Sequence, residues 1–312
     1  MPELPEVETI VRGLRKKIIG RKIKSVWFDS PSQISLQEAW EGKPKFVKAP
    51  KADILNKQIK GLKIIDVQRR AKNILIYFSS DKMMLIHQKM TGHLLYGKWE
   101  IKKAQGTKQL VQSIIKGAMQ DKVNDFIHLI LCFDNGWQLA LSDMRKFAKV
   151  IFGDKKEIED LRELKELGPE PLEKSFDFKK FKEAVGNKTR KIKQVLMDPY
   201  IIAGIGNIYS DDILWEAKIH PFQSAKTLKG VELKRIFLAI KKILTQAVKL
   251  RGTSFSDYRD VEGKKGYYVD KRRVYQREGE KCLRCRGIIK RVKMGGRSAH
   301  FCSKCQILKS DK

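Results

Sequence analysis

The start of the chain, Met1-Pro2-Glu3-Leu4-Pro5, contains residues that suit covalent catalysis. Removal of the initiator methionine, which the small Pro2 permits, leaves a secondary amine at the N-terminus. An α-amino group has an ordinary pKa of about 8, against about 10.4 for a lysine, so more of it is neutral and nucleophilic at pH 7. Such an amine attacking a sugar C1′ forms a cationic iminium, and Glu3 beside it is a proton donor. The competing interpretation is a plain helix start, with Pro5 in the first turn and glutamates near the helix N-terminus.

Four of the five cysteines lie close together, as Cys282-x2-Cys285-x16-Cys302-x2-Cys305. Two such pairs of thiolates suit tetrahedral zinc with four protein ligands, which leaves no coordination position for a substrate. The spacing therefore predicts one structural Zn²⁺ ion in a reducing compartment, with an iron site or redox-active dithiols as the alternatives. The fifth cysteine, Cys132, lies in an apolar stretch and is expected in a core.

Composition favours a polyanionic partner. The 312 residues include 66 Lys and Arg against 36 Asp and Glu, a net charge of +30. Such an excess indicates nucleic acid, although a lysine-rich solvated surface accounts for part of it. Hydrophobic residues make up 42%, which excludes a disordered chain and allows two domains with cores. Without an apolar run of about 18 residues or a signal peptide, we expect a cytoplasmic protein that makes no membrane contact.

The hydrophobic pattern of the first half predicts a helix followed by strands. Residues 6–19 carry apolar side chains at a 3.6-residue period, which predicts an amphipathic helix ended by Gly20. Asp134-Asn135-Gly136 indicates a hairpin turn. The expected strands are 23–27, 64–68, 73–78, 83–87, 126–133, 137–141 and 149–152. The lysine-rich residues 29–60 and 97–125 are expected to be surface connections.

After residue 153 the period changes to that of helices. The expected helices are 155–166, 177–186, 189–197, 207–218 and 231–250. Leu167-Gly168-Pro169-Glu170-Pro171 is a rigid turn and a candidate domain joint. Between the third and fourth helices, Gly204-Ile205-Gly206-Asn207 has two interpretations: a simple glycine-rich connection, or a turn that points helix N-terminal amides and Asn207 at a phosphate.

Between the cysteine pairs, residues 288–292 and 298–302 predict a two-stranded hairpin around Met294-Gly295-Gly296-Arg297. A hairpin this short has almost no core, so metal binding must supply its folding free energy. Its tip displays Arg297. Residues 264–297 hold thirteen basic and three acidic residues with tyrosines interspersed. This composition predicts a nucleic-acid surface, because neutralised phosphates release their counterions.

Taken together, the motifs resemble those of the formamidopyrimidine-DNA glycosylase family, in order and along nearly the whole chain. The start Pro2-Glu3-Leu4-Pro5-Glu6-Val7-Glu8-Thr9 is one of them. The others are Gln68-Arg69-Arg70-Ala71-Lys72, Met90-Thr91-Gly92, Asp143-Met144-Arg145-Lys146-Phe147, residues 167–172, residues 204–209 and the zinc hairpin with Arg297. The related endonuclease VIII enzymes usually have glycine at the position of Leu4, so Leu4 favours the formamidopyrimidine branch.

The resemblance implies an α+β protein: an N-terminal β-sandwich with a leading helix, then a helical helix–two-turn–helix domain that ends in a β-hairpin zinc finger. The implied limits are 1–153 for the catalytic sandwich, 154–176 for a joint, 177–262 for the helical DNA-binding domain, and 263–312 for a base-capping loop and the zinc finger. The implied enzyme is a monomer that flips 8-oxoguanine and formamidopyrimidines out of double-stranded DNA, excises them, and cuts the abasic strand by β,δ-elimination.

Residue roles follow from the same resemblance. It implies that Pro2 attacks C1′ to form the Schiff base and that Glu3 protonates the sugar ring oxygen. Lys72 corresponds to the lysine of β-elimination, and Arg297 to the arginine of phosphate binding and δ-elimination. The other implied site residues are Glu6 and Glu170 at the catalytic centre, Met90, Arg145 and Phe147 in the space that the flipped base vacates, and His128, Lys188 and Asn207 against the DNA.

The chain departs from the family pattern at two places. Phe126 stands where the family commonly has a histidine that contacts DNA, and Gln88-Lys89 replaces the commoner Leu-Gly. These departures leave two alternatives open. One is an endonuclease VIII-like glycosylase for oxidised pyrimidines; the other is a catalytically silent DNA-binding protein of the same fold. The presence of Pro2, Glu3 and Lys72 disfavours the silent protein.

Overall fold

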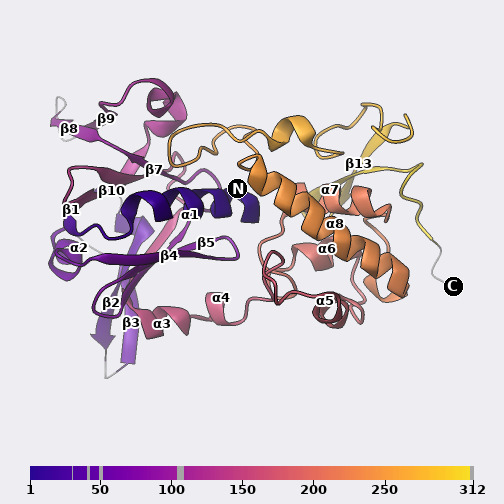
Figure 1. The fold of residues 1–312 in the computed structure, drawn as a ribbon, viewed down its shortest axis with the longest axis horizontal. Coiled ribbons are helices and arrows are strands. Elements are labelled where there is room, and N and C mark those ends of the chain that lie inside the picture. Colours follow the sequence, from indigo (N-terminus) through magenta and orange to yellow (C-terminus); the bar gives the residue numbers. More distant parts are fainter. Residues whose placement is uncertain (30, 41–42, 49–51, 104–108, 310–312) are drawn as a thin grey trace. The chain divides into compact units, whose positions relative to one another are not determined.

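The computed structural model describes residues 1–29, 31–40, 43–48, 52–103 and 109–309 (Figure 1). The chain forms two compact units. The first consists of Met1–Pro2, Glu6–Lys165 and Arg251–Gly266, and the second of Glu3–Pro5, Glu166–Leu250 and Tyr267–Lys312. The functional limits expected at residues 153, 176 and 262 stay a prediction.

One sheet of the first unit has four antiparallel strands, in the order β1-β10-β11-β7. Their bounds are Ile23–Phe28 for β1, Ile127–Phe133 for β10, Gln138–Ser142 for β11 and His93–Gly97 for β7. The expected hairpin turn joins β10 to β11, with Gly136 in the left-handed region at φ 77°. Alternation does not predict β7, because all its residues are buried and a strand without a polar face shows no alternation.

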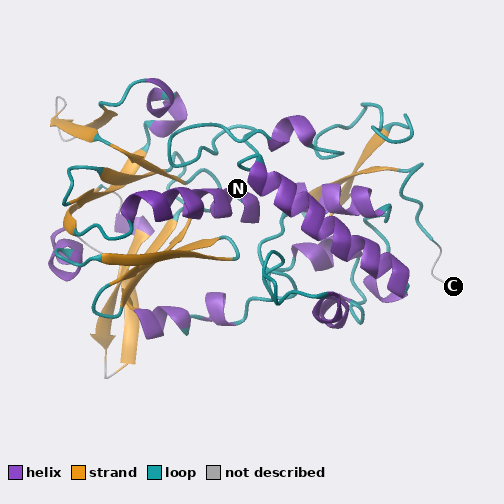
Figure 2. Ribbon diagram, viewed as in Figure 1, coloured by secondary structure: helices purple, strands orange, loops and turns teal. Residues whose placement is uncertain are grey.

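The other sheet has six strands, in the order β3-β2-β12-β6-β5-β4. Figure 2 draws the strands of the chain in orange and its helices in purple. The bounds of the six strands are Lys43–Lys48 for β3, Ile34–Trp40 for β2, Lys149–Asp154 for β12, Lys82–His87 for β6, Asn73–Phe78 for β5 and Ile64–Arg70 for β4. Neighbouring strands are antiparallel except β2 and β12, which run parallel.

A single core fills the space between these two sheets, so the predicted β-sandwich with a leading helix is confirmed. Helix α1 (Leu4–Ile18) contributes its apolar stripe, because its hydrophobic side chains recur at the helical period. Buried members of this core come from α1, the four-stranded sheet and the six-stranded sheet: Ile10, Leu14, Val26, Leu131, Ile76 and Val150.

The interpretation of residues 29–60 as a surface connection is wrong. They form the short helix η1 (Pro31–Gln33), strands β2 and β3, and helix α2 (Ala52–Ile59). Strand β2 pairs with β12 through Ile34 and Leu36, which are both buried, and α2 buries Leu55 and Ile59. The frequent lysines of this stretch hide these elements in the sequence.

The interpretation of residues 97–125 as a surface connection is also wrong. They contain strands β8 (Trp99–Lys103) and β9 (Gln109–Ser113), which pair with each other, and the short helices η2 (Gly117–Gln120) and η3 (Lys122–Asn124). Trp99, Val111 and Met119 are buried in a second, smaller core against the four-stranded sheet. The partly buried Cys132 packs there, as expected for a core cysteine.

The helix expected at 155–166 is two short helices, α3 (Lys155–Glu159) and α4 (Arg162–Lys165). Ile158 and Leu164 are their buried side chains. The backbone amide of Asp160 bonds to Lys156 and that of Leu161 to Ile158, which completes the last turn of α3. A continuous period in the sequence therefore spans a break in the helix.

Five helices make up most of the second unit. They are α5 (Phe178–Val185), α6 (Ile192–Met197), α7 (Asn207–Ala217), η4 (Ala225–Thr227) and α8 (Gly230–Lys249), and η5 (Tyr268–Lys271) follows later. Helix α7 is buried on nearly all sides, including Asp211 and Asp212. Helix α8 packs against it with an apolar stripe of Ile236, Ile240 and Leu244.

The second unit ends in the predicted hairpin of β13 (Ile289–Met294) and β14 (Arg297–Cys302). Met294 pairs with Arg297, so the connecting turn consists of Gly295 and Gly296. Both glycines have positive φ, 51° and 73°, which a two-residue turn of this hand requires. The exposed Arg297 therefore stands at the tip of the hairpin, as the sequence predicts.

Candidate active site and metal centre

Glu3 lies at the N-terminus of helix α7. Its carboxylate is 3% exposed and accepts hydrogen bonds from the backbone amides of Gly206 at 2.7 Å and Ile208 at 2.9 Å, with Tyr209 further away at 3.5 Å. These amides have no partner inside the helix, and the helix dipole favours a negative group at this end. Both oxygens of Glu3 are therefore held in one orientation.

This arrangement depends on glycines at two positions. A side chain on Gly206 would place its Cβ 2.3 Å from Cδ of Glu3, and Gly204 lies at φ +84° with Leu4 in the way of any Cβ. The amide of Leu4 donates to the carbonyl of Gly204 at 3.1 Å. The glycines thus let residues 3 and 4 lie directly against the connection before α7.

The two interpretations of this connection can now be compared. The amides that the phosphate interpretation assigned to DNA are occupied by the carboxylate of Glu3. Asn207 is different, because its side-chain Oδ1 is buried without a hydrogen-bond partner among the described residues. The helix N-terminus therefore positions an acid, and Asn207 keeps an acceptor for another group.

A buried ion pair lies beneath this end of α7. The ammonium of Lys193 on α6 pairs with Asp211, and neither side chain has any exposed surface. Burial lowers the pKa of Lys193 below its ordinary value, and the charge of Asp211 opposes the shift. Asp211 also accepts from the backbone amide of His300 at 2.9 Å and from its Nδ1 at 3.0 Å. The network joins α6, α7 and β14, and sequence patterns do not reveal it.

The neighbouring Asp212 holds the chain that leads into the zinc hairpin. It accepts hydrogen bonds from the hydroxyl of Tyr268 at 2.8 Å and from the amides of Arg273 and Val274 at 3.0 and 2.9 Å. Burial raises the pKa of Asp212, and these donors oppose the shift. Two adjacent aspartates of α7 therefore fix both β14 and the segment before β13.

Glu6 positions the start of the 251–266 segment within the first unit. Its carboxylate is 1% exposed and accepts from the amide of Thr253 at 2.7 Å. A Cβ on Gly252 would lie 2.6 Å from Oε1 of Glu6, and the hydroxyl of Tyr258 donates to the Glu6 carbonyl at 3.3 Å. Burial, followed by the charge of Glu6, raises the pKa of Tyr258 well above its ordinary range. Glu6 is thus a structural carboxylate in this unit.

Lys72 lies in the turn between β4 and β5, after the end of the strand that carries Arg69 and Arg70. The turn consists of Ala71, at φ 53°, and Lys72, and it joins the paired Arg70 and Asn73. A two-residue turn presents its side chains at the end of the hairpin, which places the Lys72 amine at the edge of the sheet.

Arg69, next to this turn, forms part of an ion-pair cluster with α1. Its guanidinium donates to Glu8 at 2.8 Å, and Arg12 donates to the other oxygen of Glu8 at 2.7 Å. Burial raises the pKa of Glu8, but the two arginines outweigh it and the pKa is lowered overall. The strand that leads to Lys72 is therefore attached to the first helix.

Three side chains predicted to enter DNA lie on two loops of the first unit. Met90 is 44% exposed on the loop of residues 88–92, and Phe147 is 51% exposed on the loop of residues 143–148. The guanidinium of Arg145 lies 4.5 Å from the centre of the Phe147 ring. Exposed large apolar side chains beside a stacked cation are the features of a group that inserts between bases.

The remaining predicted DNA contacts differ in exposure. His128 is largely buried on β10, where its Nδ1 lies 2.7 Å from Asp29, so Nε2 is the ring atom left for a phosphate. Lys188 is exposed after the end of α5. Glu170 is 4% exposed, in the turn before α5. Phe126, which replaces a family histidine, is 39% exposed.

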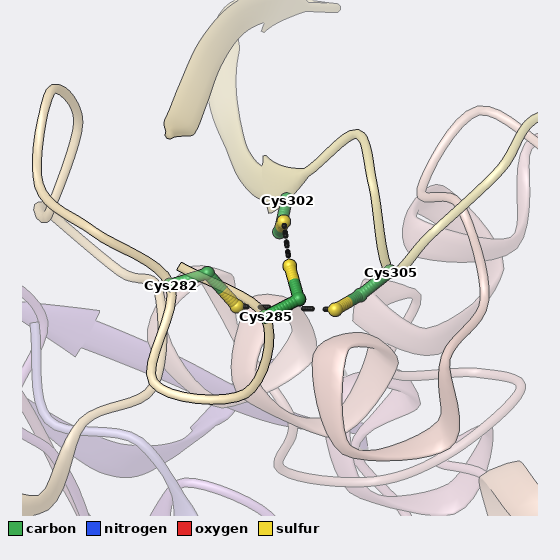
Figure 3. A group of neighbouring side chains, drawn as sticks. All are labelled: Cys282, Cys285, Cys302 and Cys305. Carbon is green, nitrogen blue, oxygen red and sulfur yellow. Dashed lines mark hydrogen bonds between the residues drawn. The ribbon is translucent and has the colours of Figure 1, made fainter. Parts of the chain in front are cut away.

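The four cysteines form one cluster (Figure 3). Their sulfur atoms all lie within 4.8 Å of one another, with 3.9 Å between Cys282 and Cys305 and 3.4 Å between Cys285 and Cys302. A regular tetrahedron of zinc–sulfur bonds of about 2.3 Å requires sulfur atoms about 3.8 Å apart. The indole of Trp215 donates to the sulfur of Cys282 at 3.3 Å, a typical second contact to a zinc thiolate. The donor set fits one structural Zn²⁺ ion.

Comparison with known families decides what this arrangement is. The formamidopyrimidine-DNA glycosylase N-terminal domain matches residues 1–150, and the H2TH domain of the same enzymes matches residues 167–259. A zinc finger found in FPG and IleRS matches residues 279–307. The chain belongs to the formamidopyrimidine-DNA glycosylase (Fpg) family.

Curated Fpg proteins resemble the chain over their full length. The Fpg of Desulforamulus reducens is 36% identical over 307 residues, which cover 98% of this chain and 99% of the relative. The Fpg of Streptococcus pneumoniae serotype 4 is 33% identical over 310 residues, with 98% and 99% covered. Both relatives are bacterial. Among the described residues, no helix is long and apolar enough to cross a membrane.

Solved structures of Lactococcus lactis Fpg share the fold. A variant in complex with DNA that contains Fapy-dG has a TM-score of 0.80 and 31% identity, over 98% of this chain and 100% of that one. A complex with DNA that contains an abasic site has the same score and identity, over 98% and 99%. The comparisons support the Fpg fold of a sandwich, an H2TH domain and a zinc finger.

The predicted Fpg site residues divide between the two compact units. Those in the first unit are Pro2, Glu6, Lys72, Met90, His128, Arg145 and Phe147. Those in the second are Glu3, Glu170, Lys188, Asn207, Arg297 and the four cysteines. Because Pro2 and Glu3 are consecutive, the chain passes from one unit to the other at the predicted nucleophile. This crossing is not visible in the sequence.

Proposed function

We propose that the chain excises 8-oxoguanine and formamidopyrimidines from DNA and then cleaves the abasic strand. The observation that carries this proposal is the carboxylate of Glu3, fixed by the amides of Gly206 and Ile208 immediately after Pro2. An acid held beside an N-terminal secondary amine is the pair that imine chemistry at a sugar carbon needs. Fpg family membership makes the chain a base-excision-repair glycosylase, and the lyase step follows from the same imine.

The first steps use Pro2 and Glu3. The Pro2 nitrogen forms a bond to C1′ while the bond from C1′ to the damaged base breaks, and the base leaves with the electron pair. The Glu3 carboxylate takes the proton that the Pro2 nitrogen loses and gives it to the ring oxygen O4′. The C1′–O4′ bond then opens, and an iminium joins Pro2 to the sugar. The two hydrogen bonds to Glu3 orient its carboxyl group for this transfer.

Strand cleavage then follows from the iminium, which acidifies the C2′ protons. We assign Lys72 to this β-elimination, in which a C2′ proton is removed and the 3′ phosphate leaves. Arg297, at the tip of the zinc hairpin, binds the phosphate and assists its departure in δ-elimination. We also assign Glu170 to the catalytic centre, and Lys188 and Asn207 to contacts with the DNA backbone.

Base eversion is assigned to the exposed side chains of the first unit. Extruding a nucleotide costs a few kcal/mol in lost stacking. Side chains that fill the gap offset this cost. Met90 and Phe147 supply apolar surface for the gap, and Arg145 supplies hydrogen-bond donors for the unpaired partner base. His128 contacts a phosphate through Nε2. Glu6 shapes the segment after α8 and takes no part in the reaction.

The bound Zn²⁺ ion contributes structure only, because four thiolates leave it no position for a substrate. Its ligand Cys282 precedes the β13–β14 hairpin, and its ligand Cys302 is the last residue of that hairpin, which carries Arg297. We place the enzyme at the nucleoid, in the cytoplasm of a bacterium, where its substrate and a reducing environment for the thiolates coincide.

Borohydride trapping on an 8-oxoguanine duplex tests the nucleophile. Reduction of the imine links wild-type enzyme to DNA, and Pro2→Gly is expected to lose the cross-linked species. A second variant with an alanine inserted between Met1 and Pro2 keeps the proline but blocks its amine, so it should lose the adduct as well. An undiminished adduct in the extended variant would contradict the role of Pro2. Intact mass shows whether Met1 is removed.

A preference for oxidised pyrimidines is the second candidate. One L. lactis Fpg structure similar to this chain, with a TM-score of 0.79 and 31% identity, is a complex with DNA that contains an oxidised pyrimidine. Single-turnover excision from 8-oxoguanine, formamidopyrimidine and thymine glycol duplexes separates the two candidates. We expect the two purine lesions to be excised faster, and faster excision of thymine glycol would favour the alternative.

A further inference from the structure

A fully buried carboxylate connects the two loops that carry Met90, Arg145 and Phe147. Asp143, with no exposed surface, follows the last residue of β11. Its Oδ2 accepts from the backbone amide of Ala148 at 2.7 Å and from Nε2 of Gln33 at 3.0 Å. Its Oδ1 accepts from the hydroxyl of Thr91 and, more weakly, from the amide of Arg145 at 3.3 Å.

Thr91 completes the connection between the loops. Its hydroxyl donates to Asp143 and accepts from the backbone amide of Arg145 at 3.2 Å. Thr91 is 7% exposed and directly follows Met90 in the 88–92 loop. One hydroxyl and one carboxylate therefore fix the backbone beside Met90 to the backbone of Arg145.

A buried charge is tolerated only where hydrogen bonds replace its solvation. Asp143 meets this condition only while the 88–92 loop and the 143–148 loop keep their present relation, because its donors come from both. Movement of either loop would leave the carboxylate short of donors. The exposed Met90 and Phe147 are thus carried on a backbone that resists rearrangement.

We propose that Thr91 and Asp143 are positioning residues for base eversion. They hold Met90, Arg145 and Phe147 in the arrangement that fills the gap. The conformational entropy of ordering these loops is therefore lost during folding and not when the protein binds DNA. The proposal rests on the eversion role given to these three side chains under the proposed function. Neither Thr91 nor Asp143 contacts the reacting atoms.

Gln33 gives the segment of residues 29–60 a part in the same network. It is 1% exposed at the end of η1, directly before β2, and its Nε2 bonds to Asp143. Its Oε1 has no hydrogen-bond partner among the described residues, so the bond to Asp143 is what orients this side chain. The parallel pairing of β2 with β12 brings Gln33 to this position. We infer that the segment supports the eversion loops.

Thr91→Val and Thr91→Ser form the test pair. Valine keeps the shape of threonine without the hydroxyl, and serine keeps the hydroxyl. We expect Thr91→Val to slow single-turnover excision of 8-oxoguanine from a duplex by about tenfold or more. Cleavage of a pre-formed abasic site should stay near the wild-type rate, because no base has to be unstacked there. Thr91→Ser should restore the wild-type ratio of the two rates.

Fluorescence of 2-aminopurine beside the lesion measures eversion without chemistry. In a Pro2→Gly background, Thr91→Val should still reduce the fluorescence rise that accompanies insertion of the loops. The fluorescence measurement tests the inference separately from the proposed function. Failure of borohydride to cross-link the wild-type enzyme to DNA would contradict the covalent mechanism, whereas the fluorescence depends only on insertion of the two loops.

Two results would overturn the inference. One is an equal loss of both rates in Thr91→Val, which a merely structural defect produces; the other is no change in either rate. Should Thr91→Val fold poorly, Gln33→Met supplies the same reading, since it removes the Nε2 bond to Asp143 and keeps the packing. It should slow excision about two- to fivefold, in proportion to a single lost hydrogen bond, and leave abasic-site cleavage unchanged.

Discussion

The carboxylate of Glu3 and the backbone amide of Gly206 lie 2.7 Å apart, although 203 residues separate them in the chain. The contact is possible only because position 206 has no side chain, since a Cβ there would lie 2.3 Å from Cδ of Glu3. The amides at the start of α7 then act as fixed donors to an acidic residue. The orientation of the proposed proton donor therefore depends on a glycine that is distant in the sequence but belongs to the same compact unit.

Gly206→Ala is expected to displace the Glu3 carboxyl group and slow base excision. A misplacement of about 1 Å can cost on the order of 100-fold in rate, and we expect a loss of that size in single-turnover excision of 8-oxoguanine. Gly230→Ala is the control, because a Cβ there meets no atom within 4 Å. An unchanged rate in Gly206→Ala would show that the carboxyl orientation does not matter.

Loss of zinc is expected to weaken DNA binding. Cys285→Ala removes one of the four sulfur ligands, and the β13–β14 hairpin, which has little core of its own, should lose its folded state. We expect zinc content by mass spectrometry to fall from one ion per chain towards zero, and Kd by fluorescence anisotropy to rise at least about tenfold, as contacts such as that of Arg297 are lost. Cys132→Ala, outside the cluster, should keep both values.

Much of the fold follows from local patterns. The helical period of α1 and α8, the turn at Gly136 and the four cysteines are all short-range features, and the structure contains them as expected. Strand β7 does not follow, because it is buried on both faces and shows no alternation. Strand β2 does not follow either. It pairs with the lysine-rich β3, and a lysine-rich stretch of sequence suggests a surface connection rather than a pair of strands.

The site is harder to predict because its contacts are long-range. Gly204 and Gly206 suggest a close approach of backbone, and the sequence leaves open whether a phosphate or nothing in particular lies opposite. Only the folded structure shows that the group opposite these glycines is the carboxylate of Glu3. The buried pair of Lys193 and Asp211 and the bond of Gln33 to Asp143 join residues 18 and 110 positions apart, with no spacing that indicates them.

Gln88→Leu is expected to stabilise the protein. Gln88 is 1% exposed, and neither of its side-chain polar atoms has a hydrogen-bond partner among the described residues. A buried unsatisfied polar group costs about 1–3 kcal/mol, and leucine removes it at similar volume. The free energy of unfolding from urea titration should rise by about that amount. Gln112→Leu, at an exposed position of β9, is the control and should change little. A lower stability in Gln88→Leu would mean that the amide is bonded after all.

His87 should make the first unit less stable in mild acid. Burial, followed by the charges of Lys89 and Lys72, lowers the pKa of His87 to about 3. Its Nδ1 accepts the backbone amide of Lys89 at 3.0 Å, which requires the unprotonated ring. Since the unfolded chain takes up this proton near pH 6.5, the stability is full above that pH and is lost as the pH falls from 6.5 towards 3.

His87→Asn isolates this contribution. The asparagine Oδ1 can accept the same amide of Lys89 without titrating, so the variant lacks the proton uptake on unfolding. Urea unfolding between pH 7.5 and 4.5 should give a wild-type stability that falls more steeply than that of the variant, by up to about 1.4 kcal/mol per pH unit below pH 6.5. The buried His93, whose pKa burial also lowers, contributes equally to both proteins and cancels in the difference. Parallel curves for the two proteins would show that His87 takes up its proton in the folded state, and the turn before Met90 would then tolerate an imidazolium.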